Sequence, residues 1–415
     1  MGRWIGSRAE AAGSRENVVR PDGWSQRMGD CPSQPGHPLK PERTEAFLLS
    51  GQHLLALISN LLRDHEVIAP VYEPETGCVV MDRISSPDQM AMGYRDQQGP
   101  GRYAVERADG LLLGYANGPR SPKDFLHPSH TSIFSGEWHD GGFSLAASPG
   151  PERPFAFVGT HPCDCAAIQV LDRVFLDGTY WDVRYRSRRT GCFVVAISCT
   201  EPGDVCFCAS MGTGPRAKDN CDLRITEIPG GLVAEPVSES GFAAVRRLSA
   251  RRATHAEMQE AYRLLNVAVD RMGRTLATDG LPAALRSRLD HPYWEVIGRW
   301  CLGCTNCTAV CPTCFCNDFR DHIDLRLERI RRERVWDSCF TRQFAEMAGW
   351  NPRDMLKHRY RHWCLHKLSY WVEQYGVFGC VGCGRCITWC PVGIDITAVA
   401  AEIRRDRGSE QARGD

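Results

Sequence analysis

The sequence predicts an α+β protein, with a mixed α/β domain over residues 43–250 and a mainly helical, cysteine-rich domain over residues 251–415. Three observations predict this class. Short strand-like runs separated by turns fill residues 100–240, helical periodicity dominates after residue 254, and most of the 21 cysteines fall into three dense groups. Fifty basic side chains balance fifty acidic ones, so net charge favours neither a nucleic acid nor an anionic membrane as partner.

Residues 1–42 are rich in Gly, Ser, Pro and charge and have no helical or strand period. We expect a disordered extension there. No apolar run approaches the ~20 residues that a membrane span needs. The N-terminus also lacks an apolar core preceded by basic residues, so we expect a cytoplasmic protein without a membrane span.

The first domain shows helical spacing from Thr44 to Leu62, followed by the strand-like run HEVIAPV. Further expected strands are RYAV, GLLLGYA, FAFVG, CFVVAIS, LRITEI and GLVAEP. FAFVG leads through a loop into the amphipathic segment AAIQVLDRVF, which makes a strand-loop-helix unit. Because CFVVAIS is almost wholly apolar, we expect a central strand covered on both faces, in a mixed or parallel sheet.

The second domain opens with a capping box, in which Thr254 is the N-cap and Glu257 follows three residues later. Helical patterns are also expected over three later segments, residues 321–336, 341–348 and 363–375. The sequence therefore predicts a mainly helical C-terminal domain.

Two cysteine runs in this domain repeat one spacing, C-x2-C-x2-C-x3-C-P. In the ferredoxin run, three closely spaced thiolates wrap one 4Fe-4S cluster and the fourth reaches the other cluster. The spacing predicts two clusters, the first held by Cys301, Cys304, Cys307 and Cys390 and the second by Cys380, Cys383, Cys386 and Cys311. Zinc knuckles are the alternative, but zinc sites commonly pair two CxxC units and give no reason for a doubled run of three.

A long interval separates Cys311 from Cys380 and is filled by helical sequence, which indicates a helical ferredoxin-type fold. Six cations lie in or before the second run. If these side chains lie beside a cluster, their charge favours its reduced state. An equally good interpretation is that they cover a solvated helix face. The six residues are Arg353, Lys357, Arg359, Arg361, Lys367 and Arg385.

A third metal site is expected in the first domain. Cys163 follows the strand FAFVG and Cys199 follows CFVVAIS. If these strands are parallel neighbours, both cysteines emerge at the carboxyl edge of the sheet, where Cys206 and Cys208 return in a loop. Asp164 or Cys165 are alternative ligands, whereas Cys192 and Cys221 are expected to be packed thiols. Both an iron-sulfur cluster and a closed zinc site fit four thiolates.

Several longer segments resemble the iron-sulfur beta subunit of cytoplasmic nickel-iron hydrogenases of the sulfhydrogenase type, from about Thr44 to the end. They are CLGCTNCTAVCPTCFCND, RVWDSCFTRQFAEMAGWNPR, RHWCLHKLSYW, CVGCGRCITWCPVGIDI, GTHPCDCAAIQVLDRVF and SCTEPGDVCFCASMGTGP. The architecture is also similar to the A subunit of anaerobic sulfite reductase. The resemblance implies a redox role and so favours an iron-sulfur cluster at the third site.

The resemblance further implies an electron-transfer subunit that is not catalytic alone. Its partners would be a flavoprotein subunit that exchanges hydride with NAD(P)H and the small and large subunits of a nickel-iron hydrogenase. This chain has no GxGxxG fingerprint, and MGTGP is expected to be a turn. A competing hypothesis is a sulfur or polysulfide reductase with Cys314, Cys316 or Cys339 as reactive thiols, although thiols packed beside clusters are usually inert.

Overall fold

The computed structural model describes residues 39–40, 45–108, 110–139 and 141–405. The extension expected over residues 1–42 therefore lies outside the described residues, apart from Leu39 and Lys40. The backbone of Leu39 is held by Asn266, which accepts its N–H at 2.8 Å and donates to its carbonyl at 3.1 Å. The described residues all belong to one compact unit.

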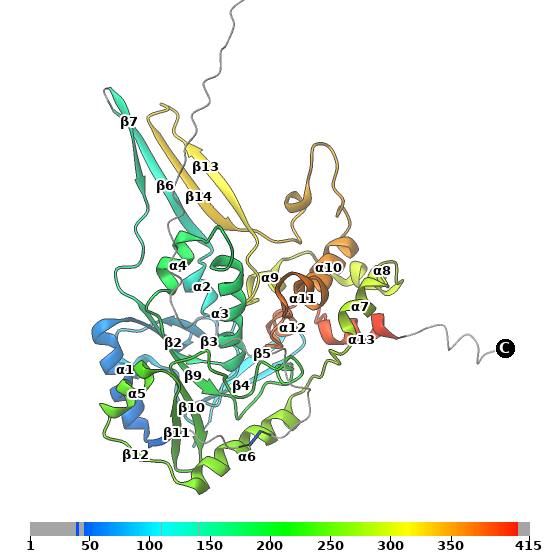
Figure 1. Cartoon of the computed structure of the whole chain (residues 1–415). Coiled ribbons are helices and arrows are strands. Elements are labelled where there is room, and N and C mark those ends of the chain that lie inside the picture. Colours follow the sequence, from blue (N-terminus) through cyan, green and yellow to red (C-terminus); the bar gives the residue numbers. More distant parts are fainter. Residues whose placement is uncertain (1–38, 41–44, 109, 140, 406–415) are drawn as a thin grey trace, which may run out of the picture. The chain divides into compact units, whose positions relative to one another are not determined.

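A mixed sheet of eight strands forms the centre of the first half of the chain (Figure 1). Its spatial order is β12 (Arg251–Arg252), β1 (Phe47–Leu49), β11 (Gly231–Pro236), β10 (Leu223–Ile228), β9 (Phe193–Ser198), β8 (Phe155–Thr160), β2 (Glu66–Glu73) and β3 (Cys78–Arg83). The four strands β10, β9, β8 and β2 run parallel, and the remaining neighbours pair antiparallel. The expected mixed sheet is confirmed, and so is the parallel pairing of the strands that precede Cys163 and Cys199.

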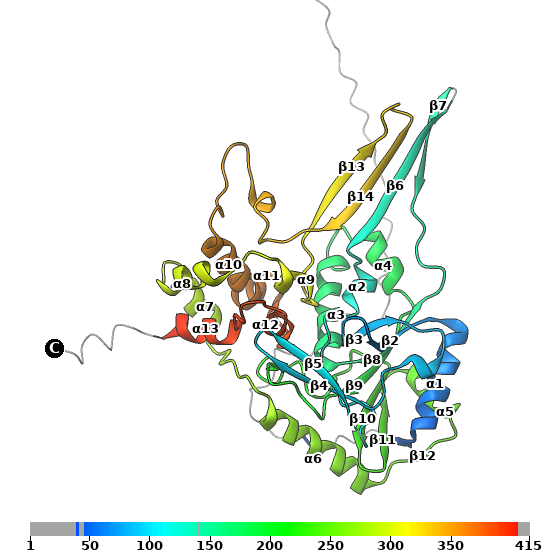
Figure 2. The same ribbon diagram turned by 180° about the vertical axis from the view of Figure 1, so that it is seen from behind.

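Helices cover both faces of this sheet because its central strands are apolar on both sides. Every residue of β8 and β9 is buried. Along β9, Val195 and Ile197 join the core that contains α1 (Gly51–Asp64), whereas Val194 and Ala196 join the core that contains α3 (Pro162–Phe175). This alternation follows the two-residue period of a strand. The other helices of this half are α2 (Lys123–Leu126), α4 (Val183–Arg189) and α5 (Glu239–Arg246), of which Figure 2 shows α5 close to α1.

Two expectations for this half differ from the structure. The helix expected from Thr44 begins only at Gly51, because Phe47–Leu49 pairs with β11 as a strand and Ser50 then caps the helix by accepting the His53 N–H at 3.3 Å. GLLLGYA is not a strand. The Glu227 carboxylate accepts the N–H groups of Leu112 and Leu113 at 2.7 and 2.8 Å, so a side chain satisfies the amides that a ladder would need.

The second half contains eight α-helices among the described residues. The capping box of Thr254 and Glu257 is confirmed at the start of the first of them. Residues 363–375 are helical as expected, through a π-helical turn at His366–Tyr370. The helices are α6 (His255–Arg271), α7 (Leu281–Arg286), α8 (Tyr293–Trp300), α9 (Asn306–Ala309), α10 (Leu356–Leu365), α11 (Trp371–Tyr375), α12 (Arg385–Thr388) and α13 (Ile396–Arg404). None of the helices in the described ranges is long and apolar enough to cross a membrane.

The helix expected over residues 321–336 is wrong. These residues belong to the hairpin of β13 (Asn317–Ile323) and β14 (Arg329–Trp336). On its other side β14 pairs with β6 (His130–His139), which pairs in turn with β7 (Gly142–Ala147). Arg332 and Asp321 form a bidentate cross-strand pair at 2.7 Å. Residues 341–348 form no α-helix but a short 3-10 turn, Gln343–Ala345, followed by an isolated bridge between Met347 and Trp350. The second half is therefore not helical throughout.

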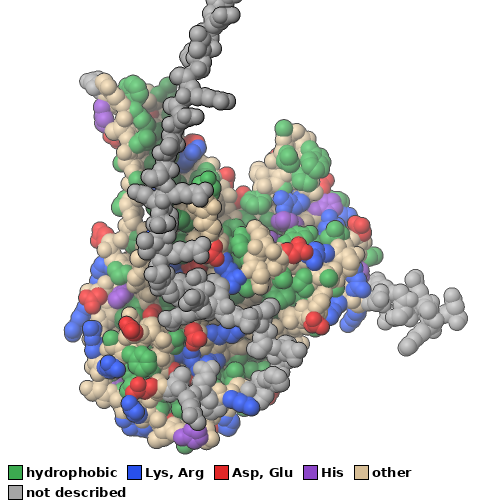
Figure 3. Space-filling model, viewed as in Figure 1, with side chains coloured by type: hydrophobic (Ala, Val, Ile, Leu, Met, Phe, Trp, Pro, Cys, Tyr) green, Lys and Arg blue, Asp and Glu red, His purple; other side chains and the backbone are tan. Residues whose placement is uncertain are grey.

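The four-stranded sheet extends away from the helices, and its far end carries exposed apolar side chains (Figures 1 and 3). Trp138, Phe143 and Leu145 on β6 and β7 are 62%, 46% and 64% exposed. A separate hairpin, β4 (Tyr94–Gly99) and β5 (Arg102–Arg107), lies against the second cysteine run, where the Gly101 N–H donates to the Ile387 carbonyl at 3.1 Å. The first half of the chain thus contacts the cysteine-rich part directly.

Candidate iron-sulfur centres

The two cysteine runs adopt the same local structure. The residue before the second cysteine of each run is a left-handed glycine, Gly303 at φ +63° and Gly382 at φ +68°. Each of these glycines donates its N–H to the sulfur of the first cysteine, Cys301 or Cys380, at 3.4 Å. A short helix follows each loop, α9 or α12. Backbone amides directed at thiolate sulfur are the hydrogen bonds that tune iron-sulfur clusters.

A small pocket joins the first run to the last cysteine of the second run. Cys301, Cys304, Cys307 and Cys390 line it, together with Cys386 and the rings of Phe340, Tyr360 and Trp363. The Cys390 sulfur also accepts the Ile394 N–H at 3.3 Å. Cys304 is exposed, whereas the other three are partly buried. The structure therefore brings together the four cysteines assigned by spacing to the first cluster.

The second set forms around Cys311. Burial raises the pKa of Cys380, Cys383 and Cys386, and the neighbouring Cys311 raises each of them further. Thiolates in such surroundings are costly without a compensating cation, and bound iron supplies that charge. The donor set therefore fits a 4Fe-4S cluster. Among the described residues, no group of three or more His, Cys, Asp or Glu side chains is arranged to hold a single metal ion.

Two of the six expected cations are buried beside the second set. Arg385 is 1% exposed and makes a bidentate pair with Asp164 at 2.6 and 2.8 Å. Lys367 is 2% exposed and donates to the Thr313 hydroxyl at 2.7 Å. Burial opposes its charge, but Cys311, Cys314 and Cys380 outweigh burial and raise the pKa of Lys367. These two cations do not lie on a solvated helix face.

The third group of cysteines adjoins the second set. Cys163, Cys206 and Cys208 share one buried cluster with Cys383. Cys199 is not part of that cluster; burial raises the pKa of its thiol, and Cys206 and Cys208 raise it further.

Asn117 links this group to the second run. Its amide donates to the Cys163 sulfur at 3.4 Å and to the Cys383 carbonyl at 3.3 Å. The Phe207 N–H donates to the Gly382 carbonyl at 2.9 Å. The chain thus places the third group directly against the second set.

Of the two alternative ligands, Cys165 packs away from the third group, and Asp164, which adjoins Cys163, is paired with a cation. Cys165 and Cys221 belong to a different core, against which Cys192 packs. The Asp164 carboxylate accepts two hydrogen bonds from Arg385. Its charge is therefore already matched.

Comparison with known proteins identifies the family. A 4Fe-4S dicluster domain model matches residues 300–394, which include both cysteine runs. Over 327 residues, 78% of this chain and 92% of the relative, the chain is 30% identical to the sulfhydrogenase 2 subunit beta of Pyrococcus furiosus. The chain belongs to the sulfhydrogenase beta-subunit family. This match confirms the resemblance noted in the sequence and the prediction that the chain is an iron-sulfur protein of hydrogenase type.

Lys123 is a buried cation of this beta-subunit homologue that the sequence did not reveal. Lys123 is 2% exposed, donates to the Ala309 carbonyl at 2.9 Å and lies 3.7 Å above the Trp336 ring. Burial lowers its pKa, and Cys314 and Cys311 oppose that change. No local sequence pattern marks this burial, because the partners of Lys123 are far away in the sequence.

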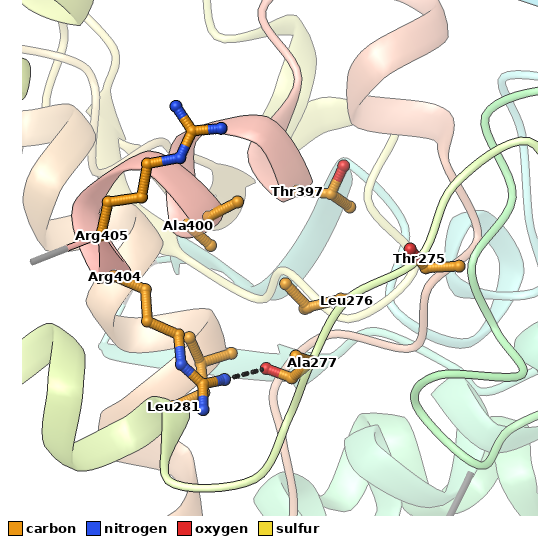
Figure 4. A pocket seen from close by; sticks show the side chains of 9 residues that line it. Thr275, Leu276, Ala277, Leu281, Thr397, Ala400, Arg404 and Arg405 are labelled. Carbon is orange, nitrogen blue, oxygen red and sulfur yellow. Dashed lines mark hydrogen bonds between the residues drawn. The ribbon is translucent and has the colours of Figure 1, made fainter. Parts of the chain in front are cut away.

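The sulfhydrogenase beta-subunit homologue also has a hollow of about 260 Å³ between α7, α13 and residues 275–277. Figure 4 shows Arg404 bonded to the Ala277 carbonyl, at 2.9 Å, at its wall. Its lining contains no cysteine among the described residues. The hollow is therefore separate from the three groups of thiols.

Proposed function

We propose that this chain relays single electrons in the cytoplasm between a flavoprotein subunit that exchanges hydride with NAD(P)H and the small and large subunits of a nickel-iron hydrogenase. The observation that carries this proposal is a continuous series of thiols. Cys386 of the second set lines the pocket of the first set, and Cys383 shares a buried cluster with Cys163, Cys206 and Cys208. Contiguous redox centres are what a relay requires.

In this proposal Cys301, Cys304, Cys307 and Cys390 hold one 4Fe-4S cluster, and Cys380, Cys383, Cys386 and Cys311 hold the second. Each cluster, when bound, accepts and releases one electron. The amides of Gly303 and Gly382 and the buried cations Lys367 and Arg385 stabilise the reduced, more negative state. Cys163, Cys199, Cys206 and Cys208 hold a third cluster at the end of the series.

The chain alone is not expected to be an enzyme. We expect the anaerobically purified chain to show reduced-cluster EPR signals with NAD(P)H only when a flavoprotein partner is present, and to evolve no dihydrogen. Rapid reduction of sulfite or polysulfide by the chain alone would overturn the relay. Productive pairing with a sirohaem sulfite reductase in place of the hydrogenase would reassign the terminal enzyme and leave the electron-transfer role.

The ligand sets are tested by Cys304→Ser. Cys304 is exposed, so this change costs little packing, and we expect the loss of about four of the bound irons. Iron and sulfide analysis of the full chain measures this. Cys364→Ala is the control, because Cys364 is a buried cysteine of the same core outside both runs. Equal iron content in the two variants would contradict the assignment.

A further inference from the structure

Cys316 and Cys339 meet at the base of the β13–β14 hairpin. Asn317 pairs with Trp336 in the ladder, and the Asp337 N–H donates to the Cys316 carbonyl at 3.0 Å. Cys316 therefore lies opposite Asp337, two residues before Cys339. The Cys316 and Cys339 thiols are close enough for a hydrogen bond between them to shift the pKa of both.

The two thiols have different surroundings. Cys339 is 5% exposed, whereas Cys316 is only partly buried. Donation from Cys339 lowers the pKa of Cys316 to about 7 against the effect of burial, and Lys367 lowers it further. The same hydrogen bond and burial raise the pKa of Cys339. A partly buried thiol with a lowered pKa beside a buried thiol with a raised pKa is the arrangement of dithiol redox pairs.

The pair also lies within the core that surrounds the proposed clusters. Cys339 is part of that core, and Cys316, Cys301, Cys307 and Cys380 all pack against it. A redox change at the pair is therefore close to single-electron centres. Packed, inert thiols are the usual alternative, but they do not require the direct thiol-to-thiol hydrogen bond.

We propose that Cys316 and Cys339 form a dithiol–disulfide couple that exchanges electrons with the two C-terminal clusters, an inference that rests on the proposed relay function. In the reducing direction, each of the two reduced clusters gives one electron to the Cys316–Cys339 disulfide. The S–S bond breaks, two protons are taken up and two thiols form. The reverse step releases two electrons and two protons. The pair thereby stores two electrons beside one-electron carriers.

The test uses the anaerobically purified, cluster-loaded full chain, equilibrated over a series of thiol–disulfide redox buffers. Free thiols are alkylated in denaturant, and peptides are analysed by mass spectrometry. We expect Cys316 and Cys339 to lose the alkyl label together, in one linked peptide pair. The transition should follow a two-electron curve, with about 30 mV for each tenfold change in the ratio of the two forms.

Cys316→Ser should abolish the linked peptide and leave iron and sulfide content unchanged. Cys192→Ser is the matched control, because Cys192 is also partly buried but lies in the first half of the chain; it should leave the transition unchanged. Two results overturn the proposal: both thiols staying alkylated at every potential in protein with intact clusters, or iron loss in Cys316→Ser, which would make Cys316 a ligand. Cluster reduction by the flavoprotein, followed by EPR, tests the relay separately.

Discussion

At the scale of single residues, an ion pair between Asp164 and Arg385 connects the third group of cysteines to the second run. Asp164 follows Cys163, and Arg385 precedes Cys386. Both side chains are almost fully buried, and Arg385 also donates to the Gly118 carbonyl at 2.7 Å. Because neither charge reaches water, each depends on the other.

Asp164→Asn should destabilise the protein by about 3 kcal/mol, since it leaves the Arg385 charge uncompensated in the core. Anaerobic denaturant unfolding of the cluster-loaded chain measures the shift. Asp82→Asn is the control, because its pair with Arg120 at 3.0 Å is partly exposed. That change should cost less than about 1 kcal/mol. Similar shifts in both variants would show that the buried pair has no special role.

His127 should make stability depend on pH. Burial lowers its pKa from 6.5 to about 2, helped by the charges of Arg334 and Lys123. The unfolded chain therefore takes up a proton below pH 6.5 that the folded chain refuses, so stability falls as pH falls from 6.5 toward 2.

The His127 ring lies beside Phe175 and Trp336. His127→Phe should keep this packing. It should reduce the dependence of the free energy of unfolding on pH by about 1.4 kcal/mol per pH unit. Denaturation midpoints at pH 7 and pH 5 measure it. His255→Phe, at an exposed position, should keep the wild-type slope; an unchanged slope in His127→Phe would contradict the assignment.

At the scale of secondary-structure elements, the loop of the second cysteine run packs closely against another segment of the chain. A left-handed glycine in this loop makes the close approach possible. A Cβ on Gly382 would lie 2.7 Å from the Cα and N atoms of Cys208. A Cβ on Gly376, which ends α11 at φ +71°, meets nothing within 4 Å. The two glycines share a backbone conformation and differ in their neighbours.

Gly376→Ala should therefore cost about 1 kcal/mol, the strain of a left-handed alanine. Gly382→Ala should cost more than about 3 kcal/mol and reduce bound iron, since the second loop must move away from the third group. Unfolding midpoints and iron content of the two variants decide this. Equal costs would mean that the loop does not depend on its contact with Cys208.

Local patterns predicted the elements whose signal lies within a few residues. The Thr254 capping box, the strands around β8 and β9 and the two cysteine spacings are of this kind. The β13–β14 hairpin was misread as a helix because its outer partner, β6, lies almost two hundred residues earlier in the sequence. Lys123 was missed for the same reason, since its contacts at Ala309 and Trp336 are distant in the chain.

At the scale of the whole molecule, the two halves of the chain meet at the groups of cysteines. The parallel strands β8 and β9 bring Cys163 and Cys199 to one edge of the sheet. The sequence predicted this edge, but nothing in it showed that Cys383 and Gly382 would pack against Cys206 and Cys208. A segment from the other half of the chain therefore packs directly against the third group. An experiment on it must use the full chain.

The final prediction concerns the number of clusters. Three clusters require about twelve irons, and two require about eight. Cys206→Ser in the full chain should lower the count from about twelve to about eight and remove one EPR signal, because one thiolate ligand of the third cluster is lost. Cys221→Ser is the control, since Cys221 is equally buried but packs in a different core; it should keep all the iron. Wild-type protein with about eight irons and one zinc, released by Cys206→Ser, would make the third site a structural zinc site and leave a relay of two clusters.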